Sequence, residues 1–210
     1  MTDTAVSATS VSGMDERERL NRLSRLPSAV LGDVMDRLGV MHSSIKPVWT
    51  GATLVGRAFT VWTRAGDNKT IHDALPEVKA NDVLVVNGEG DVTRALIGEL
   101  LGRRSQLAGA AGFVIDGAVR DAGGLADLGV PVFARAVTPA GPYKFGPGRI
   151  QVPVSVGGVA VMPGDYIVGD GDGVVVIRLP EVEAVIIAAE AKHQKEVDML
   201  ATMGSTISHV

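Results

Sequence analysis

Hydrophobic residues recur at helical spacing near the start of the chain. From Asp15 onward leucines follow one another at intervals of three, and Pro27 interrupts this pattern. We expect a second helix that is capped by Ser28 and runs through Leu38, where Gly39 ends it. The residues predicted to form the buried stripe of this second helix are Val30, Val34 and Leu38.

Runs of branched aliphatic residues predict a sheet in the middle of the chain. Segment 52–63 alternates and is rich in β-branched residues, which is typical of a strand. Continuous apolar runs at 83–86 and 112–115 indicate strands covered on both faces, and 131–135 predicts one more short strand. From 150 to 177, valines separated by glycine-rich turns predict a region of hairpins.

Helical patterns lie between these strands and close the chain. Segments 71–80 and 96–107 predict helices, and 181–203 predicts an amphipathic helix of about six turns. With no internal repeat or linker, we expect a single α/β domain over 14–210. Residues 1–13, rich in Thr, Ser and Ala, are predicted to be a disordered leader.

Composition and charge narrow the possible functions. Hydrophobic residues make up 46% of the 210 residues, which is ample for a sizeable core. The formal net charge of −4 argues against a nucleic-acid partner, because binding to the phosphate backbone requires a basic stripe. With no cysteine, the chain has no disulfide framework and no thiol nucleophile. It also lacks a secretory signal and an apolar run of the roughly 20 residues that span a bilayer, so we expect a soluble, cytoplasmic protein with no membrane partner.

Several common catalytic motifs are missing from the sequence. The four histidines are scattered and show no metal-ligand spacing, and there is no nucleophile elbow or phosphate loop, which disfavours zinc enzymes, α/β-hydrolases and P-loop enzymes. The Asn-Gly-Glu-Gly segment at 87–90 lacks the third glycine of a nucleotide site. Segment 169–173 lacks the acidic ligand that would close a calcium loop. We interpret both segments as turns.

The segment Gly98-Glu99-Leu100-Leu101 is the first candidate for binding chemistry. It opens a predicted helix, and the first backbone N–H groups of a helix have no intrahelical partner. Such a helix start attracts a carboxylate or phosphate through these donors and the helix dipole. Taken alone, the segment is explained more simply as a helix with glycine at its start.

The second candidate is 116–121, Asp-Gly-Ala-Val-Arg-Asp, which directly follows a predicted buried strand. Ligands of open α/β sheets collect at the carboxyl ends of strands. The carboxylate of Asp121 suits Mg²⁺ or Mn²⁺, and the guanidinium of Arg120 suits a substrate carboxylate or a developing enolate oxygen. A surface ion pair explains the same two residues equally well.

The run Val-Ile-Asp-Gly-Ala-Val-Arg-Asp at 114–121 resembles the signature of the RraA-like family. Further matching stretches, in the same order, lie at 32–36, 82–86, 98–101, 131–135, 163–165 and 171–176. The family includes 4-hydroxy-4-methyl-2-oxoglutarate aldolase and RraA regulators, which inhibit RNase E by protein contact. The resemblance implies a layered α/β/α domain of the swivelling phosphohistidine type. It also implies a homotrimer or hexamer with active sites between subunits.

The resemblance also implies roles for individual residues. The backbone amides of Gly98–Leu101 would bind the substrate carboxylate, and Arg120 would contact the 2-oxo group. Asp121 would ligate Mg²⁺ or Mn²⁺, and Glu99 would hold a water on the metal from the second shell. These roles imply an aldolase that releases pyruvate from a 4-hydroxy-2-oxo diacid and decarboxylates oxaloacetate through the same enolate.

One position departs from the pattern of the catalytic members, which usually carry an acidic residue three positions after the metal-binding aspartate. This chain has Gly124 there, and Asp127 follows one helical turn beyond. The departure favours the alternative function, a non-catalytic regulator of the RraA type. The intact Arg120 and Asp121 favour the lyase, which is our leading hypothesis.

The base that aldol cleavage requires stays open at this point. Asp33, Asp36 and Glu196, from this chain or from a neighbouring one, are candidates, although a solvated helix face is the simpler interpretation of each. A Gly/Pro-rich loop could also shape a pocket, or it could serve only for packing, which is the simpler interpretation. The residues at the centre of this loop are Tyr143, Lys144 and Phe145.

Overall fold

A computed structural model describes residues 13–207, and it describes side chains as far as residue 203. Apart from Gly13, the predicted leader lies outside the described residues.

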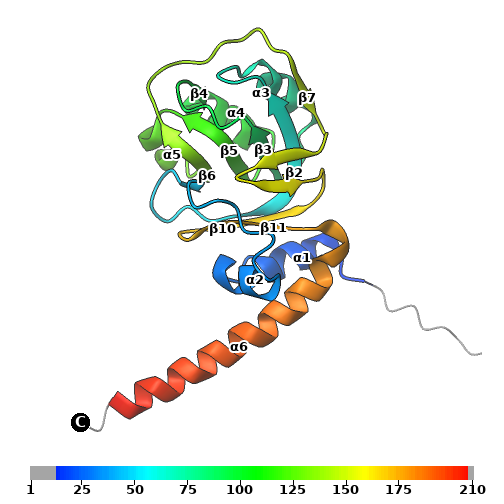
Figure 1. The fold of residues 1–210 in the computed structure, drawn as a ribbon, viewed down its shortest axis with the longest axis vertical. Helices are drawn as coiled ribbons and strands as arrows, with labels where there is room; N and C mark the ends of the chain where they lie inside the picture. Colours follow the sequence, from blue (N-terminus) through cyan, green and yellow to red (C-terminus); the bar gives the residue numbers. More distant parts are fainter. Residues whose placement is uncertain (1–12, 208–210) are drawn as a thin grey trace, which may run out of the picture.

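The body of the protein is a nine-stranded mixed sheet (Figure 1). Its strands follow the order β1-β6-β5-β3-β2-β10-β11, while β4 pairs with β5 and β7 pairs with β2. The bounds are β1 (Lys46–Pro47), β2 (Leu54–Thr63), β3 (Asp82–Asn87), β4 (Ala95–Ile97), β5 (Gly112–Val119), β6 (Val132–Val137), β7 (Gly148–Ile150), β10 (Tyr166–Asp170) and β11 (Gly173–Ile177). Strands β2, β3, β5 and β6 are parallel, and β10 and β11 join as an antiparallel hairpin. A separate hairpin consists of β8 (Val154–Val156) and β9 (Val159–Val161).

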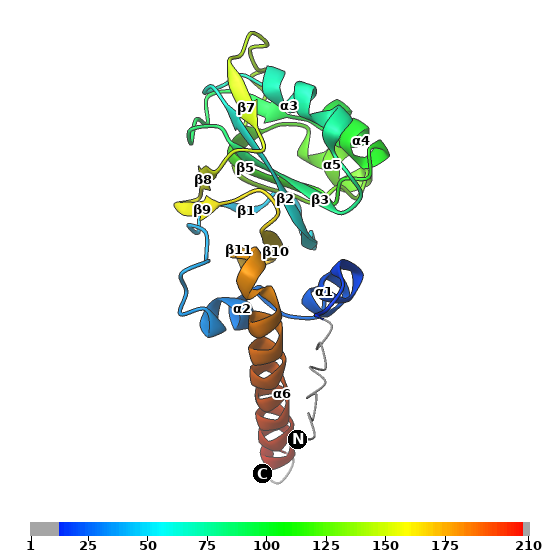
Figure 2. The ribbon, with the colours of Figure 1, turned by 90° about the vertical axis from the view of Figure 1, so that its right-hand side faces the viewer.

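Helices cover the sheet in two groups. Helices α3 (Lys69–Ala74), α4 (Glu99–Leu107) and α5 (Ala122–Asp127) pack on one face of the parallel strands (Figure 2). Helices α1 (Glu16–Leu23), α2 (Ser28–Val34) and α6 (Val182–Ile207) pack on the β10–β11 hairpin at the other end of the molecule. The predicted α/β fold class is therefore confirmed.

Strand β3 shows why the apolar runs predicted buried strands correctly. Successive side chains of a strand point to opposite faces of the sheet. Leu84 and Val86 join the cluster under α3, α4 and α5, whereas Val83 and Val85 join the cluster under the β8–β9 hairpin. Both faces of β3 are covered, so every position in the run is apolar.

The N-terminus of α2 differs from the prediction. Ser28 is the first helical residue and Pro27 holds the N-cap position. The Ser28 hydroxyl donates to Asp170 Oδ1 at 2.6 Å, and its backbone N–H donates to Asp170 Oδ2 at 2.8 Å. The serine therefore ties α2 to the end of β10, a partner 142 positions away in the chain.

The C-terminus of α2 was also predicted wrongly. The helix ends at Val34, and Leu38 is 84% exposed, so it is no part of a buried stripe. Asp36 and Arg37 adopt the left-handed backbone conformation, with φ of 50° and 67°. At Gly39 the chain passes so close to β11 that a Cβ would lie 2.3 Å from the Val176 carbonyl oxygen. The tight approach to β11 ends the helix early.

Other helices and strands begin or end at residues that differ from the predicted ones, because neighbouring elements in space extend or interrupt the local pattern. The predicted helix at 96–107 begins only at Glu99, because residues 95–97 form β4 beside β5. The predicted helix at 71–80 ends at Ala74 and continues as a short 3-10 turn. Strand β5 continues past the predicted 112–115 to Val119, where β4 and β6 flank it. Helix α5, with two glycines in its first turn, was not predicted.

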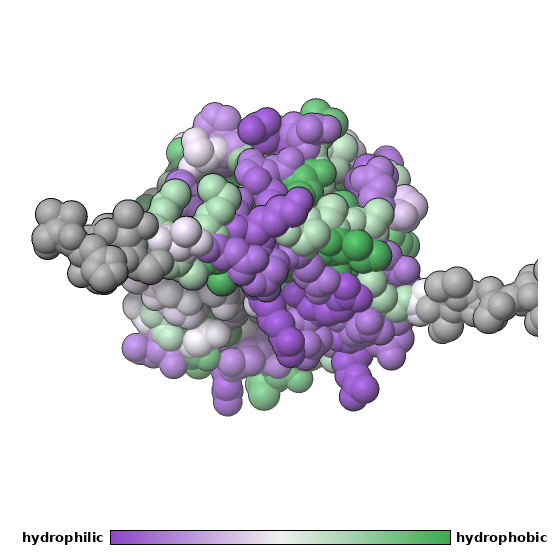
Figure 3. All heavy atoms as spheres, turned by 90° about the horizontal axis from the view of Figure 1, so that it is seen from below, coloured by the Kyte–Doolittle hydropathy of each residue, from purple (hydrophilic) through white to green (hydrophobic). Residues whose placement is uncertain are grey.

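Helix α6 packs along its first half only and then extends away from the body (Figures 1 and 2). Its buried residues are Val182, Val185, Ile186 and Ala189, and none of residues 190–203 is buried. Arg19 pairs with Glu183 at 2.6 Å and Arg22 pairs with Glu190 at 2.5 Å, which fixes the first half to α1. Seen from the end where α6 projects, hydrophobic residues form separate patches among hydrophilic ones (Figure 3). Within the described chain, no helix is both long and apolar enough to cross a membrane.

Candidate active site

The two segments singled out in the sequence lie side by side. Strand β4 pairs with the end of β5, and the Arg120 backbone N–H donates to the Ile97 carbonyl oxygen at 2.9 Å. Gly98 is the N-cap of α4, and the Glu99 N–H donates to Asp121 Oδ2 at 3.2 Å. The structure thus brings together Gly98, Glu99, Arg120 and Asp121, and the start of α4 faces the side chains that follow β5.

Position 98 has no room for a side chain. A Cβ there would lie 2.4 Å from Asp121 Oδ2 and 2.8 Å from Arg120 Cγ. The backbone of Gly98 is extended, with φ of −154°, so it is close contact and not backbone strain that requires glycine. The glycine lets the carboxylate and the guanidinium reach the first turn of α4.

Arg120 and Asp121 form an ion pair, with Arg120 Nε 3.4 Å from Asp121 Oδ2. Both side chains are about half exposed, and an exposed ion pair adds only about 0–1 kcal/mol to the free energy of unfolding. Asp121 also adopts the left-handed conformation, with φ of 54°, which costs about 1 kcal/mol or more. The pair therefore brings little net stability to the fold.

The carboxylate of Glu99 lies over Gly124. A Cβ at Gly124 would lie 2.4 Å from Glu99 Oε2, so glycine at this position leaves the space that Glu99 fills. Glu99 and Asp121 both offer oxygen ligands at this point. Among the described residues, no group of three or more His, Asp or Glu side chains forms a metal cage. Two carboxylates fit Mg²⁺ or Mn²⁺, since Mg²⁺ usually keeps several waters and takes one or two protein carboxylates.

A cavity of about 150 Å³ opens beside Arg120 and the start of α4. Its polar lining residues are Asn68, His72, Arg104, Arg120 and Lys144, and no carboxylate is among the residues that line it. Neither Arg104 nor Lys144 forms an ion pair with any described residue. This collection of cationic groups suits an anionic ligand.

Asn68 stands at the N-terminus of α3 and is 4% exposed. Its Nδ2 donates to the Leu96 carbonyl oxygen at 2.9 Å, while its Oδ1 is buried with no hydrogen-bond partner among the described residues. A buried polar atom without a partner in the protein is uncommon, and a bound ligand, ion or water is among its explanations.

His72 lies one helical turn after Asn68 and is partly buried. Burial, together with the nearby charges of Lys144 and Arg104, lowers the pKa of His72 below its ordinary value, and Asp73 opposes this shift. The imidazole is therefore neutral at neutral pH.

The buried carboxylate of Asp67 holds the loop that carries Lys144. Its Oδ2 accepts from the backbone N–H groups of Phe145, at 2.7 Å, and Gly146, at 2.9 Å. Tyr143 packs under the Arg94 guanidinium, 4.1 Å from its ring centroid, and Phe145 is 79% exposed. Tyr143 thus serves the predicted packing role, whereas Lys144 lines the cavity.

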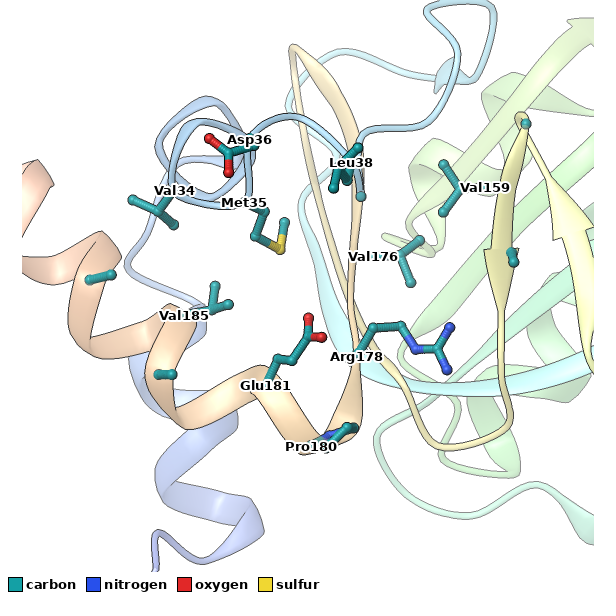
Figure 4. A pocket seen from close by; sticks show the side chains of 15 residues that line it. Val34, Met35, Asp36, Leu38, Val159, Val176, Arg178, Pro180, Glu181 and Val185 are labelled. Carbon is teal, nitrogen blue, oxygen red and sulfur yellow. The ribbon is translucent and has the colours of Figure 1, made fainter.

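The candidate bases from the sequence do not line this cavity. Asp33 and Glu196 both pair with Lys192, at 3.2 and 3.1 Å. Asp36 borders a hollow of about 790 Å³ between α2, β11 and the first half of α6 (Figure 4). Apolar side chains such as Val34, Met35 and Leu38 form much of its wall, at the end of the molecule opposite the cavity beside Arg120.

Sequence reasoning missed Asn68, His72 and Arg104 as site residues. The spacing of Asn68 and His72 puts both on one face of α3. Nothing in the sequence indicates that this face meets α4 and the loop around Lys144. These contacts depend on the packing of segments that are far apart in the chain.

The model of the RraA-like family, described as Aldolase/RraA, matches residues 28–176. A protein of Halalkalibacterium halodurans named "Putative 4-hydroxy-4-methyl-2-oxoglutarate aldolase" is 40% identical over 177 residues, which cover 84% of each chain.

Solved structures show the same likeness. The RNA-processing inhibitor RraA from Thermus thermophilis is 34% identical, with a TM-score of 0.66 over 72% of this chain and 92% of that one. RraAS2 from Streptomyces coelicolor, described as an unusual member of the RNase ES inhibitor RraA protein family, is 30% identical. Its TM-score is 0.79 over 89% of this chain and 98% of that one.

Proposed function

The chain belongs to the RraA-like family, and from this premise we propose that it is a lyase releasing pyruvate from a 4-hydroxy-2-oxo diacid. The 4-hydroxy-4-methyl-2-oxoglutarate type of substrate matches the name carried by the Halalkalibacterium relative. The observation that carries the proposal is the cavity between α3 and α4. Its charged lining residues are all cationic, and it opens beside Arg120 and the first turn of α4.

The first turn of α4 and Arg120 would bind the pyruvyl end of the substrate. The Glu99 N–H is engaged by Asp121, so the N–H groups of Leu100 and Leu101 are the donors left for the substrate carboxylate. The Arg120 guanidinium would donate to the 2-oxo oxygen. Arg104 and Lys144 would bind the second carboxylate of a diacid, which explains why neither has an acidic partner.

Bond cleavage places negative charge on the 2-oxo oxygen as the pyruvate enolate forms. Arg120 is already in place to stabilise this charge, and a preorganised donor of this kind lowers the barrier by several kcal/mol, about 3–4 for one donor. Asp121 would hold Mg²⁺ or Mn²⁺, with Glu99 contacting it through water, and the metal would supply Lewis acidity to the same oxygen. Oxaloacetate gives the same enolate on loss of CO₂, so we propose that it is a second substrate.

A specific observation favours the alternative of an RraA-type regulator that binds RNase E. Gly124 leaves the chain without the acid that catalytic members usually carry. The Thermus relative is described as an RNA-processing inhibitor, and the Streptomyces relative as an unusual member of the RNase ES inhibitor family. A protein that acts only by surface contact has no need of a cationic cavity with unpaired Arg104 and Lys144. We therefore favour the lyase.

The test is pyruvate release from 4-hydroxy-4-methyl-2-oxoglutarate and from oxaloacetate, with Mg²⁺ or with EDTA. Turnover that requires the metal and is lost in Asp121→Ala is the expected result. Asp198→Ala, on the exposed half of α6, is the matched control and should keep full activity. Lack of turnover in the folded wild type, with oxalate failing to raise Tm in the presence of Mg²⁺ or Mn²⁺, would favour the regulator.

A further inference from the structure

Aldol cleavage requires the removal of a hydroxyl proton, which decarboxylation does not require. In a 4-hydroxy-2-oxo diacid the C4 hydroxyl must lose its proton, so that the O–H electrons form the new carbonyl at C4 while the C3–C4 electrons move into the enolate. Oxaloacetate carries no such hydroxyl, and its C3–C4 bond breaks with release of CO₂. A base for this hydroxyl is therefore required for one reaction only.

Few polar side chains that line the cavity can accept a proton. The guanidinium groups of Arg104 and Arg120 and the ammonium group of Lys144 are donors without an acceptor, and the amide of Asn68 is no base. Glu99 and Asp121 are not among the residues that line the cavity. The imidazole of His72 alone among these lining groups has a lone pair available near neutral pH.

The surroundings of His72 keep it in the accepting form. Lys144 approaches it from the loop held by Asp67, and Arg104 approaches from α4. Asp73 is the acidic neighbour on α3 itself. Burial of the ring, together with the two cations, outweighs this carboxylate and disfavours a positive charge on the ring.

We propose that His72 is the general base that removes the proton of the C4 hydroxyl, a role that rests on the aldol cleavage proposed above. A ring nitrogen of His72 takes this proton as the C3–C4 bond breaks and the second carbonyl product forms. The pyruvate enolate gains a proton at C3 from solvent, and His72 returns its proton to solvent. Atoms and charge balance without any additional reactant.

The two reactions provide an internal control for the test. In His72→Gln, the kcat for cleavage of 4-hydroxy-4-methyl-2-oxoglutarate should fall by about 100-fold or more, the range typical of a lost general base. Decarboxylation of oxaloacetate by the same variant should change by less than about threefold, because that reaction needs no base at C4. His193→Gln, at a partly buried position in the part of α6 beyond Ala189, is the matched histidine control and should leave both rates unchanged.

The ring titration gives a second readout that does not depend on turnover. Proton NMR of the His72 Cε1–H in the metal-free protein, assigned by its absence in His72→Gln, should give a pKa below the ordinary 6.5. The acidic limb of kcat/KM for aldol cleavage should follow this titration and should be missing in the variant.

Three outcomes separate the possible failures. An equal loss of both reactions in His72→Gln would assign His72 to binding or structure and overturn its role as the base. Unchanged aldol cleavage would also overturn it. A wild-type protein that cleaves neither substrate would overturn the proposed function itself, and the base with it.

Discussion

The backbone N–H of Glu99 donates a hydrogen bond to Oδ2 of Asp121 at 3.2 Å. This bond joins the first residue of α4 to the residue that precedes α5. The two helices follow different strands of the sheet. It fixes the Asp121 carboxylate at the start of α4, where a helix dipole stabilises negative charge. The candidate metal ligand and the candidate carboxylate-binding amides are therefore held in one fixed arrangement.

Replacement of Gly98 by alanine should abolish this arrangement. A Cβ at 98 would lie 2.4 Å from Asp121 Oδ2 and would displace the carboxylate, so we expect kcat/KM for pyruvate release to fall on the order of 100-fold. Gly123→Ala is the matched control, because a Cβ there would meet nothing within 4 Å. Equal activity of the two variants would contradict the assigned role of Gly98.

Glu99→Gln should weaken metal binding without removing it. The variant keeps the backbone N–H bond to Asp121 but loses the charge that would orient waters on the metal. We expect the Mg²⁺ concentration needed for half-maximal stabilisation by oxalate to rise roughly tenfold or more. Thermal unfolding at a series of Mg²⁺ concentrations measures this, and an unchanged midpoint would remove Glu99 from the metal site.

Asp67→Asn should destabilise the protein in a pH-dependent way. Burial raises the pKa of the Asp67 carboxyl, but N–H donors from Lys69, Phe145 and Gly146 together with Arg64 lower it below its ordinary value of 3.8. Its stabilising effect is therefore full above pH 3.8 and is lost as the pH falls through the folded-state pKa.

Urea unfolding of wild type and Asp67→Asn checks this effect. At pH 7 we expect the variant to lose about 1.5–3 kcal/mol of unfolding free energy, the range for hydrogen bonds to a charged group. The difference should shrink in acid, below pH 3.8. Asp73→Asn, at an exposed position of α3, serves as the control and should change stability little. A pH-independent difference would show that the charge of Asp67 is not what holds the loop.

Truncation of α6 after Lys192 should leave the fold intact. No residue from 190 to 203 is buried, and the pair between Lys192 and Glu196 that would be lost is exposed. We therefore expect the free energy of unfolding to change by less than about 1 kcal/mol. Ile186→Ala, in the packed first half of the helix, should cost about 2–5 kcal/mol. Urea denaturation measures the free energy of unfolding of both variants. A large loss on truncation would mean that the distal half packs against another molecule in solution.

The sequence predicted those parts of the fold that local patterns control. Continuous apolar runs located β3 and most of β5 because both faces of these strands are covered. The end of α2 depends instead on Gly39 meeting the Val176 carbonyl, and Ser28 bonds to Asp170 across the molecule. Neither contact leaves a local signal in the sequence.

The same distinction holds for the candidate site. Gly98, Arg120 and Asp121 stand in short segments whose residue types suggest binding, so the sequence could single them out. His72 is an ordinary helical histidine until α3, α4 and the loop around Lys144 enclose it. A base that comes from one element and acts on a substrate bound by another becomes apparent only from the three-dimensional packing.

Helix α6 also has a practical consequence. Beyond residue 190 it continues to Ile207, a rigid rod of roughly 25 Å that points away from the sheet and lies at the end of the molecule opposite the cavity. A fluorophore or a surface linker attached near the far end of α6 would be kept at a distance from the sheet and from the cavity. The protein could then be immobilised with the cavity open to bulk solution, so that ligand binding could be followed without the support blocking entry.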